Sequence, residues 1–299
     1  MKRVIGAAAG IEHFKRERNL PIDAVLSDGR GLFPDKVAPN EFAARVIEIV
    51  RNEGDAGLAR INTALDGSSP AVFEVPQSEI DSALANLDPA SIAAFELAAD
   101  RVRKFQTRGL PKSWSDGTGK FGEKVTPMNS IAAYVPGGTA PLASTVIMTV
   151  VPAQVAGVKE IIVATPAPGD AMPHPAVLAA AKIAGASRVF KLGGAQAVAA
   201  LAYGTESIPA VDLICGPGSA WVTAAKKLVF GDVGIDGLYG PTETLVIADD
   251  SADPRFTASD LIAQAEHDTV AMPILVALSE DIVDTTEAEI ERQLADLQR

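Results

Sequence analysis

Four glycine-rich turns are the first candidates for ligand chemistry. They lie beside apolar, strand-like segments and are Pro136-Gly137-Gly138, Gly193-Gly194, Gly216-Pro217-Gly218 and Gly240-Pro241. Glycine lets backbone N–H groups approach a phosphate, and the N-terminus of a following helix favours its negative charge. Tight turns in parallel α/β proteins also require glycine, so any single turn has a purely structural interpretation as well. The third turn is the nearest match to the dinucleotide fingerprint GxGxxG, but Trp221 replaces the last glycine.

A helical segment from Asp260 to Asp268 could bind a metal. Gln264 and His267 are three residues apart and share a helix face, and Asp260 lies about one turn further back. An imidazole beside an amide oxygen can hold a divalent metal, although glutamine is an uncommon zinc ligand. A histidine that caps a helix end or is exposed there explains the same spacing. Spacing alone favours this second interpretation.

The remaining reactive side chains give weaker signals. Cys215 could be a nucleophile at a strand end, but no histidine is near it in the sequence, which favours a buried thiol. His13 and His174 are interpreted as structural residues. Thr242 and Glu243 follow a Gly-Pro turn and could face a ligand. The sequence contains no serine-hydrolase elbow, P-loop or CxxC motif.

Composition argues against several classes of partner. The 299 residues include 26 basic and 38 acidic residues, a formal net charge of −12. This acidic balance argues against a nucleic-acid binder and against docking on an anionic membrane. No apolar run reaches the roughly 18 residues that a membrane span needs. A single cysteine cannot form an internal disulfide, and a cytoplasmic protein is expected.

The N-terminal part of the chain is predicted to be mostly helical. Asn40 is expected to cap a helix over 41–54, because apolar residues recur there with helical spacing. A short strand is expected at 71–76. Asp88 and Pro89 then form an N-cap and N1 pair for a long helix.

From about residue 130, apolar strands alternate with helices. The expected strands are 130–135, 160–166, 188–194, 212–215, 244–250 and 273–279. Pro152 is expected to end or kink the helix after the first of them. This alternation predicts an α/β fold with parallel sheets covered on both faces, in Rossmann-like halves. The last helix should lead into another strand, so the chain is expected to be a fragment of something longer.

Taken in order, these motifs resemble histidinol dehydrogenase. The resemblance is dense from about residue 125 to 280 and rests on YVPGG, APLASTV, PAQVAGVKEI, GGAQAVAALAYGTESIP, GPG, AKKLVFG, GIDGLYGPTETLVIADDSADP and SDLIAQAEHD. It implies a zinc-dependent enzyme that uses NAD to oxidise L-histidinol through histidinal to L-histidine, the last step of histidine biosynthesis. It also implies a homodimer in the complete protein, with active sites built from both chains.

The resemblance implies two Rossmann-like domains after a helical N-terminal segment. The expected division is a segment 1–38, a discontinuous, incomplete domain 39–127 plus 240–299, and an inserted NAD-binding domain 128–239. Tyr134, Gln196 and Ser219 match positions that contact NAD. The family usually has asparagine in place of Ser219, but a serine hydroxyl can still donate and accept a hydrogen bond.

The resemblance also assigns a substrate and metal site. Thr242, Gln264 and His267 match substrate-binding positions, and Gln264 and His267 match two zinc ligands, which replaces the structural interpretation of their helix. The family's Glu-His base pair and two further zinc ligands lie beyond Arg299, so no catalytic residue is assigned. Catalytic zinc normally takes three protein ligands. We therefore expect the chain to match the N-terminal two-thirds of such an enzyme and to be inactive alone.

Two other hypotheses are also compatible with the sequence. One is a related zinc- and NAD-dependent alcohol dehydrogenase, such as a sulfopropanediol-type enzyme, and some of these share the GPTE variant. The other is a truncated, non-catalytic relative that binds dinucleotide without retaining stoichiometric zinc. Turnover of the two alcohols by a full-length protein, together with zinc content, would distinguish them.

Overall fold

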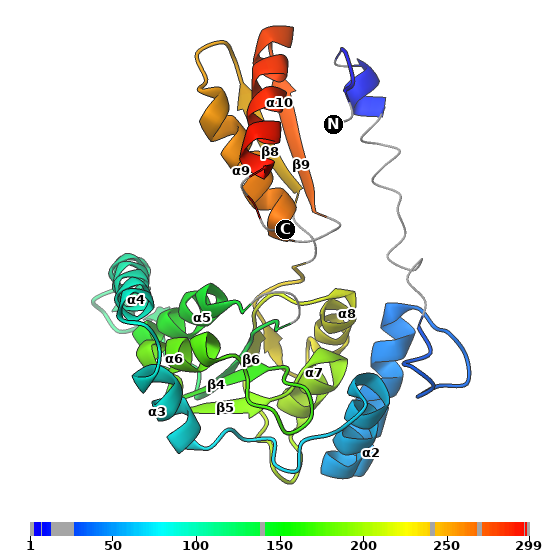
Figure 1. The fold of residues 1–299 in the computed structure, drawn as a ribbon. Helices are drawn as coiled ribbons and strands as arrows, with labels where there is room; N and C mark the ends of the chain where they lie inside the picture. The colour runs from blue at the N-terminus through cyan, green and yellow to red at the C-terminus, as the bar shows by residue number, and fades with distance from the viewer. Residues whose placement is uncertain are drawn as a thin grey trace. The chain divides into compact units, whose positions relative to one another are not determined.

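The computed structural model describes residues 3–6, 8–12, 27–137, 141–239, 243–267, 271–295 and 297. They belong to two compact units (Figure 1). Unit 2 spans Pro21–Leu238, and unit 1 combines Met1–Leu20 with Tyr239–Arg299. Each unit contains a parallel β-sheet with helices packed on it, which confirms the predicted α/β class.

Five parallel strands form the sheet of unit 2, in the order β5-β4-β3-β6-β7. Their bounds are β3 (Ser130–Tyr134), β4 (Glu160–Thr165), β5 (Arg188–Lys191), β6 (Leu213–Cys215) and β7 (Gly234–Ile235). In register, Ala132 of β3 lies beside Ile162 of β4 on one side and Ile214 of β6 on the other. The chain first adds β4 and β5 on one side of β3, and then adds β6 and β7 on the other. The strand order therefore reverses between β3 and β6.

Helices cover both faces of this sheet (Figure 1). One face packs against α2 (Pro39–Asp66), α7 (Gly194–Tyr203) and α8 (Ala220–Val229), and the other against α3 (Gln77–Ala85), α4 (Pro89–Gly109), α5 (Ala143–Ala156) and α6 (Pro175–Ala184). Side chains of β3 alternate between the two cores, with Ala132 and Tyr134 in the first and Ile131 and Ala133 in the second. The strands are apolar throughout because helices shield both faces from water.

Helix α2 differs from its predicted bounds at both ends. It begins at Pro39 with Ala38 as the N-cap, so Asn40 lies inside the first turn and does not cap the helix. Proline suits this position because its missing N–H would have no helical partner there. The backbone leaves helical geometry at Gly54, where φ is 55°. Helical geometry then resumes, and α2 runs on to Asp66. At Gly54 the Glu206 carboxylate accepts a hydrogen bond from the next backbone N–H at 2.8 Å, replacing the interrupted helical bonding.

Of three further expectations about local elements, one is wrong, one is wrong in part and one is confirmed. Pro152 lies inside helix α5 and does not end it. Segment 71–76 is not a strand, since it pairs with β5 through an isolated antiparallel bridge between Glu74 and Phe190. The predicted cap is present, because the Asp88 side chain accepts a hydrogen bond from the N–H three residues later at 2.8 Å. Between α4 and β3 the chain adds a short antiparallel pair, β1 (Trp114–Ser115) and β2 (Gly122–Glu123).

Unit 1 contains a two-stranded parallel sheet and two long helices. These elements are β8 (Glu243–Ala248), α9 (Pro254–His267), β9 (Met272–Ala277) and α10 (Glu280–Leu294). On β8, Leu245 and Ile247 are exposed, whereas Ala248 is buried. Within the described parts of the chain, no helix is both long and apolar enough to cross a membrane.

The helices of residues 39–109 lie in the same compact unit as the five-stranded sheet. The family resemblance implies instead that these helices join residues 240–299 in a discontinuous domain. The domain boundaries of the complete protein therefore stay a prediction.

Candidate functional site

Tyr134 occupies the carboxyl end of the central strand β3, where the sheet meets its turns. Its side chain is buried, and its hydroxyl oxygen accepts a hydrogen bond from the Gly194 N–H at 3.1 Å. Burial raises the pKa of the Tyr134 phenol, and the Asp66 carboxylate raises it further, while the Gly194 N–H opposes these effects. The phenol therefore stays protonated near neutral pH, and its proton is available to a hydrogen-bond acceptor.

Gln196 follows on the first turn of α7 and is 2% exposed. Its Nε2 donates a hydrogen bond to Asn62 Oδ1 at 3.1 Å, whereas its Oε1 is buried without a hydrogen-bond partner among the described residues. A Cβ atom on Gly194 would lie 2.5 Å from this Oε1, and Gly194 has a φ of 65°. The positive φ favours glycine here, and any Cβ would displace the Gln196 amide. Tyr134 and Gln196, two of the predicted site residues, therefore both lie beside Gly194.

The Gly216-Pro217-Gly218 turn joins β6 to α8 and lies close to the end of β3. Gly216 has a φ of 108°, and a Cβ on it would lie 2.1 Å from the Tyr134 carbonyl oxygen. A Cβ on Gly218 would lie 2.4 Å from the side chain of Val222. Both glycines are thus needed for close approach. Gly218 allows α8 to pack closely on this turn, although tryptophan replaces the last glycine of the fingerprint.

Ser219 is the N-cap residue of α8, and its exposed side chain makes no capping hydrogen bond. The N–H groups of a first helical turn lack partners within the helix, and the helix dipole makes this end positive. The arrangement suits a negatively charged or hydrogen-bonding ligand group. Trp221 packs against Phe42 of α2, with ring centroids 4.8 Å apart, and so anchors α8 on the helical layer.

Two side chains that the sequence analysis missed hold this turn. The Lys226 ammonium donates to the Gly216 carbonyl oxygen at 2.9 Å and pairs with Asp236, whose other carboxylate oxygen accepts the Gly216 N–H at 2.8 Å. A signal was present in the sequence, because Lys226 shares the apolar stripe of α8 with Val222 and Val229. A charged residue in such a stripe indicates a buried ion pair.

The other reactive side chains of unit 2 have structural roles. Cys215 is buried, and burial, assisted by the Asp236 carboxylate, raises the pKa of its thiol to about 12. It is therefore a poor nucleophile, as the sequence suggested. His174 caps α6, since its Nδ1 accepts a hydrogen bond from the Ala176 N–H at 3.2 Å. His13 lies outside the described residues.

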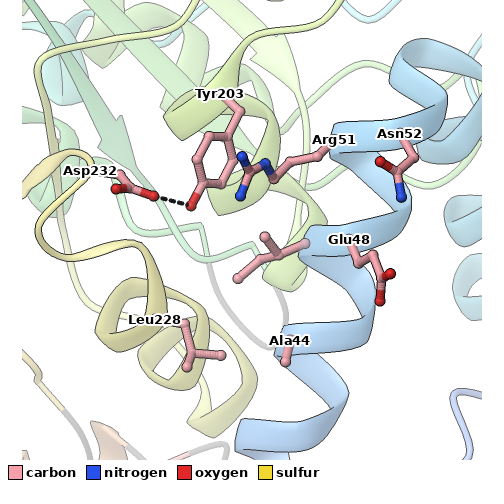
Figure 2. Close-up of a pocket in the computed structure, with 8 residues that line it drawn as sticks. Ala44, Glu48, Arg51, Asn52, Tyr203, Leu228 and Asp232 are labelled. Atoms are coloured by element: carbon pink, nitrogen blue, oxygen red, sulfur yellow. Dashed lines mark hydrogen bonds between the residues drawn. The ribbon is translucent and has the colours of Figure 1, made fainter.

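A hollow of about 560 Å³ lies elsewhere in unit 2, between α2, α7 and α8 (Figure 2). The Arg51 guanidinium stacks over the Tyr203 ring at 4.4 Å, and the Tyr203 hydroxyl donates to Asp232 at 2.8 Å. None of the residues predicted to bind cofactor, substrate or metal lines it. The candidate site is therefore the carboxyl edge of the sheet and not this hollow.

In unit 1, helix α9 carries Gln264 and ends at His267. Gln264 Oε1 accepts a hydrogen bond from Thr244 Oγ1 of β8 at 2.5 Å, which fixes the orientation of the amide and leaves Oε1 a second lone pair. Thr242 and the side chain of His267 lie outside the described residues. Across the described chain, no group of three or more His, Cys, Asp or Glu side chains is arranged to hold a metal.

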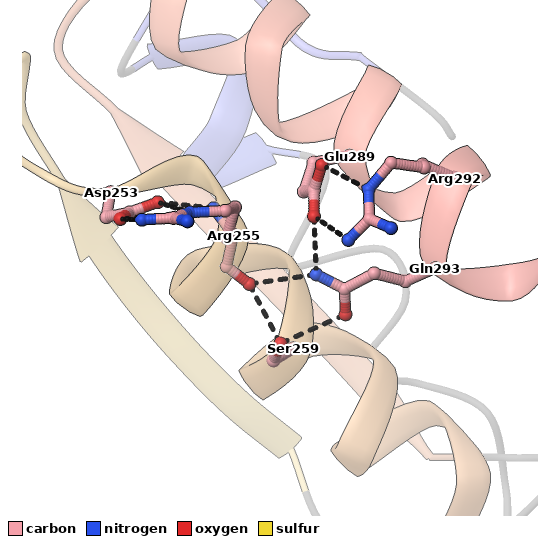
Figure 3. Close-up of polar contacts among 6 residues, drawn as sticks. All are labelled: Asp253, Arg255, Ser259, Glu289, Arg292 and Gln293. Carbon is pink, nitrogen blue, oxygen red and sulfur yellow. Dashed lines mark hydrogen bonds and ion pairs between the residues drawn. The ribbon is translucent and has the colours of Figure 1, made fainter.

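Polar contacts with α10 hold the first half of α9 (Figure 3). Gln293 Nε2 donates to the Arg255 carbonyl oxygen at 3.0 Å, and Ser259 Oγ donates to Gln293 Oε1 at 3.0 Å. Glu289 also accepts from Gln293 Nε2 at 3.0 Å and pairs with Arg292. This network fixes the start of α9, while the candidate ligands lie at its other end.

Comparison with known proteins supports one family. The sequence profile of histidinol dehydrogenase matches residues 35–299. The histidinol dehydrogenase of Deinococcus radiodurans is 47% identical over 302 residues, which cover 99% of this chain and 68% of that protein. The histidinol dehydrogenase of Thermus thermophilus is 48% identical over 272 residues, which cover 90% of this chain and 64% of that protein.

The fold leads to the same family. A crystal structure of histidinol dehydrogenase from Elizabethkingia anophelis matches with a TM-score of 0.81 and 35% identity, covering 92% of this chain and 65% of that one. The chain thus spans about two thirds of the length of these relatives. Since the profile match covers most of the chain, the chain belongs to the histidinol dehydrogenase family.

Proposed function

We propose that unit 2 binds NAD at the carboxyl edge of its sheet, beside the reversal of strand order between β3 and β6. In open parallel sheets, ligands bind outside the carboxyl ends of the strands at such a point. Tyr134 ends β3, and the turn that begins at Gly216 follows β6, so both flank the reversal. This placement is the observation that carries the proposal.

The groups at this edge fit a dinucleotide. The N-terminus of α8, with Ser219 as its cap residue, suits a pyrophosphate because backbone N–H groups and the helix dipole both favour negative charge. The Tyr134 hydroxyl can donate a hydrogen bond, and Gln196 Oε1 has an acceptor position to offer. When bound, NAD would supply the hydride acceptor for an alcohol oxidation. The protein side chains would bind and orient it.

For the complete protein we propose the oxidation of L-histidinol to L-histidine, the last step of histidine biosynthesis, by a cytoplasmic homodimer. Family membership supports this proposal, since the matched relatives carry the name histidinol dehydrogenase. The substrate is assigned to Thr242, Gln264 and His267 by resemblance. The two alternative hypotheses gain no support from these comparisons.

Zinc is assigned to Gln264 and His267 by resemblance alone. The described side chains do not form a complete zinc site, because they include no group of three suitable ligands. We therefore attribute no step of the reaction to zinc. Zinc content measured after dialysis, compared between the complete protein and its Gln264→Leu variant, tests the assignment. Equal zinc in both would contradict it.

Tryptophan fluorescence offers a direct test of NAD binding. The chain has two tryptophans, and a Trp114→Phe variant leaves Trp221, two positions after Ser219, as the reporter. NAD should change its emission in a saturable way, and calorimetry should give the same Kd. Lack of saturation in both measurements would overturn the proposed cofactor site.

A further inference from the structure

We propose that Lys226 and Asp236 are positioning residues that hold the Gly216 turn in the conformation that binds NAD. The inference rests on the proposed function, because it assumes that this turn is part of the cofactor site. Neither residue is among those that the family resemblance assigns to NAD. Both act through the backbone of Gly216.

The Lys226–Asp236 ion pair contacts both peptide groups that flank the Cα atom of Gly216. Asp236 accepts the Gly216 N–H at 2.8 Å, and the Lys226 ammonium donates to the Gly216 carbonyl oxygen at 2.9 Å. Lys226 and Asp236 also pair with each other at 2.5 Å. Both backbone groups of one glycine are therefore fixed by one pair of opposite charges. Asp236 also accepts the N–H of the neighbouring Gly237 at 2.8 Å, which helps to orient its carboxylate.

This glycine has a conformation that residues with a Cβ rarely adopt, and it lies at a close backbone contact. Its φ is 108°, and its backbone passes so close to the Tyr134 carbonyl that a Cβ atom would lie 2.1 Å from it. A small rotation here would move the N-terminus of α8, where Ser219 lies. The same contact couples the turn to the end of β3. Lys226 and Asp236 thus control the relative position of two predicted NAD contacts, Tyr134 and Ser219.

Stability alone is a weak reason for burying this lysine. The Lys226 side chain is 2% exposed and lies in an apolar helix stripe with Val222 and Val229. Burying an ammonium removes its hydration, and pairing it with the partly exposed Asp236 often contributes little compared with an apolar side chain of similar size. Geometric control of the turn is a benefit that an apolar side chain could not provide.

The test compares Lys226→Met with Lys226→Arg in the full chain. Methionine retains the apolar stem but removes the charge and the donor, whereas arginine retains both. Lys182→Met is the matched control, because Lys182 of α6 forms an exposed ion pair with Asp81 of α3 at 2.9 Å. For each variant we would measure the Kd for NAD, the thermal midpoint and amide hydrogen exchange over residues 214–220.

The expected result is a roughly tenfold higher Kd for NAD in Lys226→Met, equivalent to about 1.4 kcal/mol. Exchange should rise over 214–220 and stay unchanged at the turn after β5. Lys226→Arg should restore much of the affinity, and Lys182→Met should bind as the parent protein does. Should Lys226→Met prove unstable, Asp236→Asn provides a second variant with the same expected pattern.

Unchanged NAD affinity in a folded Lys226→Met protein would overturn the inference. So would an affinity loss accompanied by faster exchange throughout the sheet, since that pattern indicates a merely structural role. If the parent protein itself binds no NAD, the proposed function fails, and the inference about NAD fails with it. Hydrogen exchange would then still show whether the ion pair holds the turn.

Discussion

The hydroxyl of Tyr134 accepts a hydrogen bond from the backbone N–H of Gly194 at 3.1 Å. This contact reaches from the end of β3 to the start of α7, across the intervening strand β4. The Gly194 N–H belongs to a first helical turn, where N–H groups have no helical partner. The phenol therefore completes a helix end and, through its own proton, can also donate to a ligand.

Tyr134→Phe should weaken NAD binding and modestly destabilise the protein. The variant leaves the Gly194 N–H without its acceptor, which should cost about 1 kcal/mol of unfolding free energy. The matched control is Tyr203→Phe, whose hydroxyl donates to Asp232 at 2.8 Å beside the hollow of Figure 2. Urea denaturation and NAD titration would be measured for both. Equal losses of NAD affinity would show that Tyr134 has no specific role.

Asn62→Leu should destabilise the protein by about 2 kcal/mol, because it leaves the buried Nε2 of Gln196 without a hydrogen-bond acceptor. Leucine has a similar size, so the loss would reflect the missing hydrogen bond more than a cavity. Asn86→Leu is the control, since Asn86 lies exposed at the end of α3. Urea midpoints would be compared. If Asn86→Leu loses as much stability as Asn62→Leu, the loss does not come from the buried hydrogen bond between Asn62 and Gln196.

Gly216→Ala should destabilise the protein far more than Gly231→Ala. The two glycines have similar φ angles, 108° and 112°, so alanine is strained by about 1–3 kcal/mol at either position. Only at Gly216 would the new Cβ also collide with the Tyr134 carbonyl, because nothing lies within 4 Å at Gly231. The difference between the unfolding free energies of the two variants, measured by chemical denaturation, gives the cost of the collision. Similar unfolding free energies would mean that the turn can relax.

The ion pair between Glu74 and Arg188 should make stability depend on pH. Arg188 donates two hydrogen bonds to Glu74, at 2.9 and 2.6 Å, and holds the pKa of that carboxyl below its ordinary range. A folded pKa below the unfolded value means that the contribution is present above the unfolded pKa and is lost as pH falls through the folded one. Because both side chains are partly exposed, we expect at most about 1 kcal/mol.

A Glu74→Gln variant tests this expectation. The stability difference between parent and variant should be largest near neutral pH and should shrink as pH falls below about 4, close to the ordinary glutamate pKa. Urea midpoints at several pH values would measure it, with Glu79→Gln on α3 as the control. A difference that stays constant with pH would exclude the ion pair as its source.

The α/β class and most element positions could be predicted from local sequence patterns. Apolar strands and helices with regular spacing are local patterns, and Asp88 is a local cap, so both could be predicted from neighbouring residues. The family motifs added Tyr134, Gln196 and Ser219 as candidate NAD contacts. The structure places Tyr134 and Gln196 around one turn and puts Ser219 at the N-terminus of α8.

Only the tertiary structure revealed the partners that hold these residues. Asn62 and Gln196 are 134 positions apart, and the break at Gly54 depends on Glu206 from a distant loop. Lys226 could be suspected as a charge in an apolar stripe, but the contact of its ammonium with Gly216 appears only in the fold. Such contacts depend on how strands and helices from separate parts of the chain pack together, and local spacing carries no information about that packing.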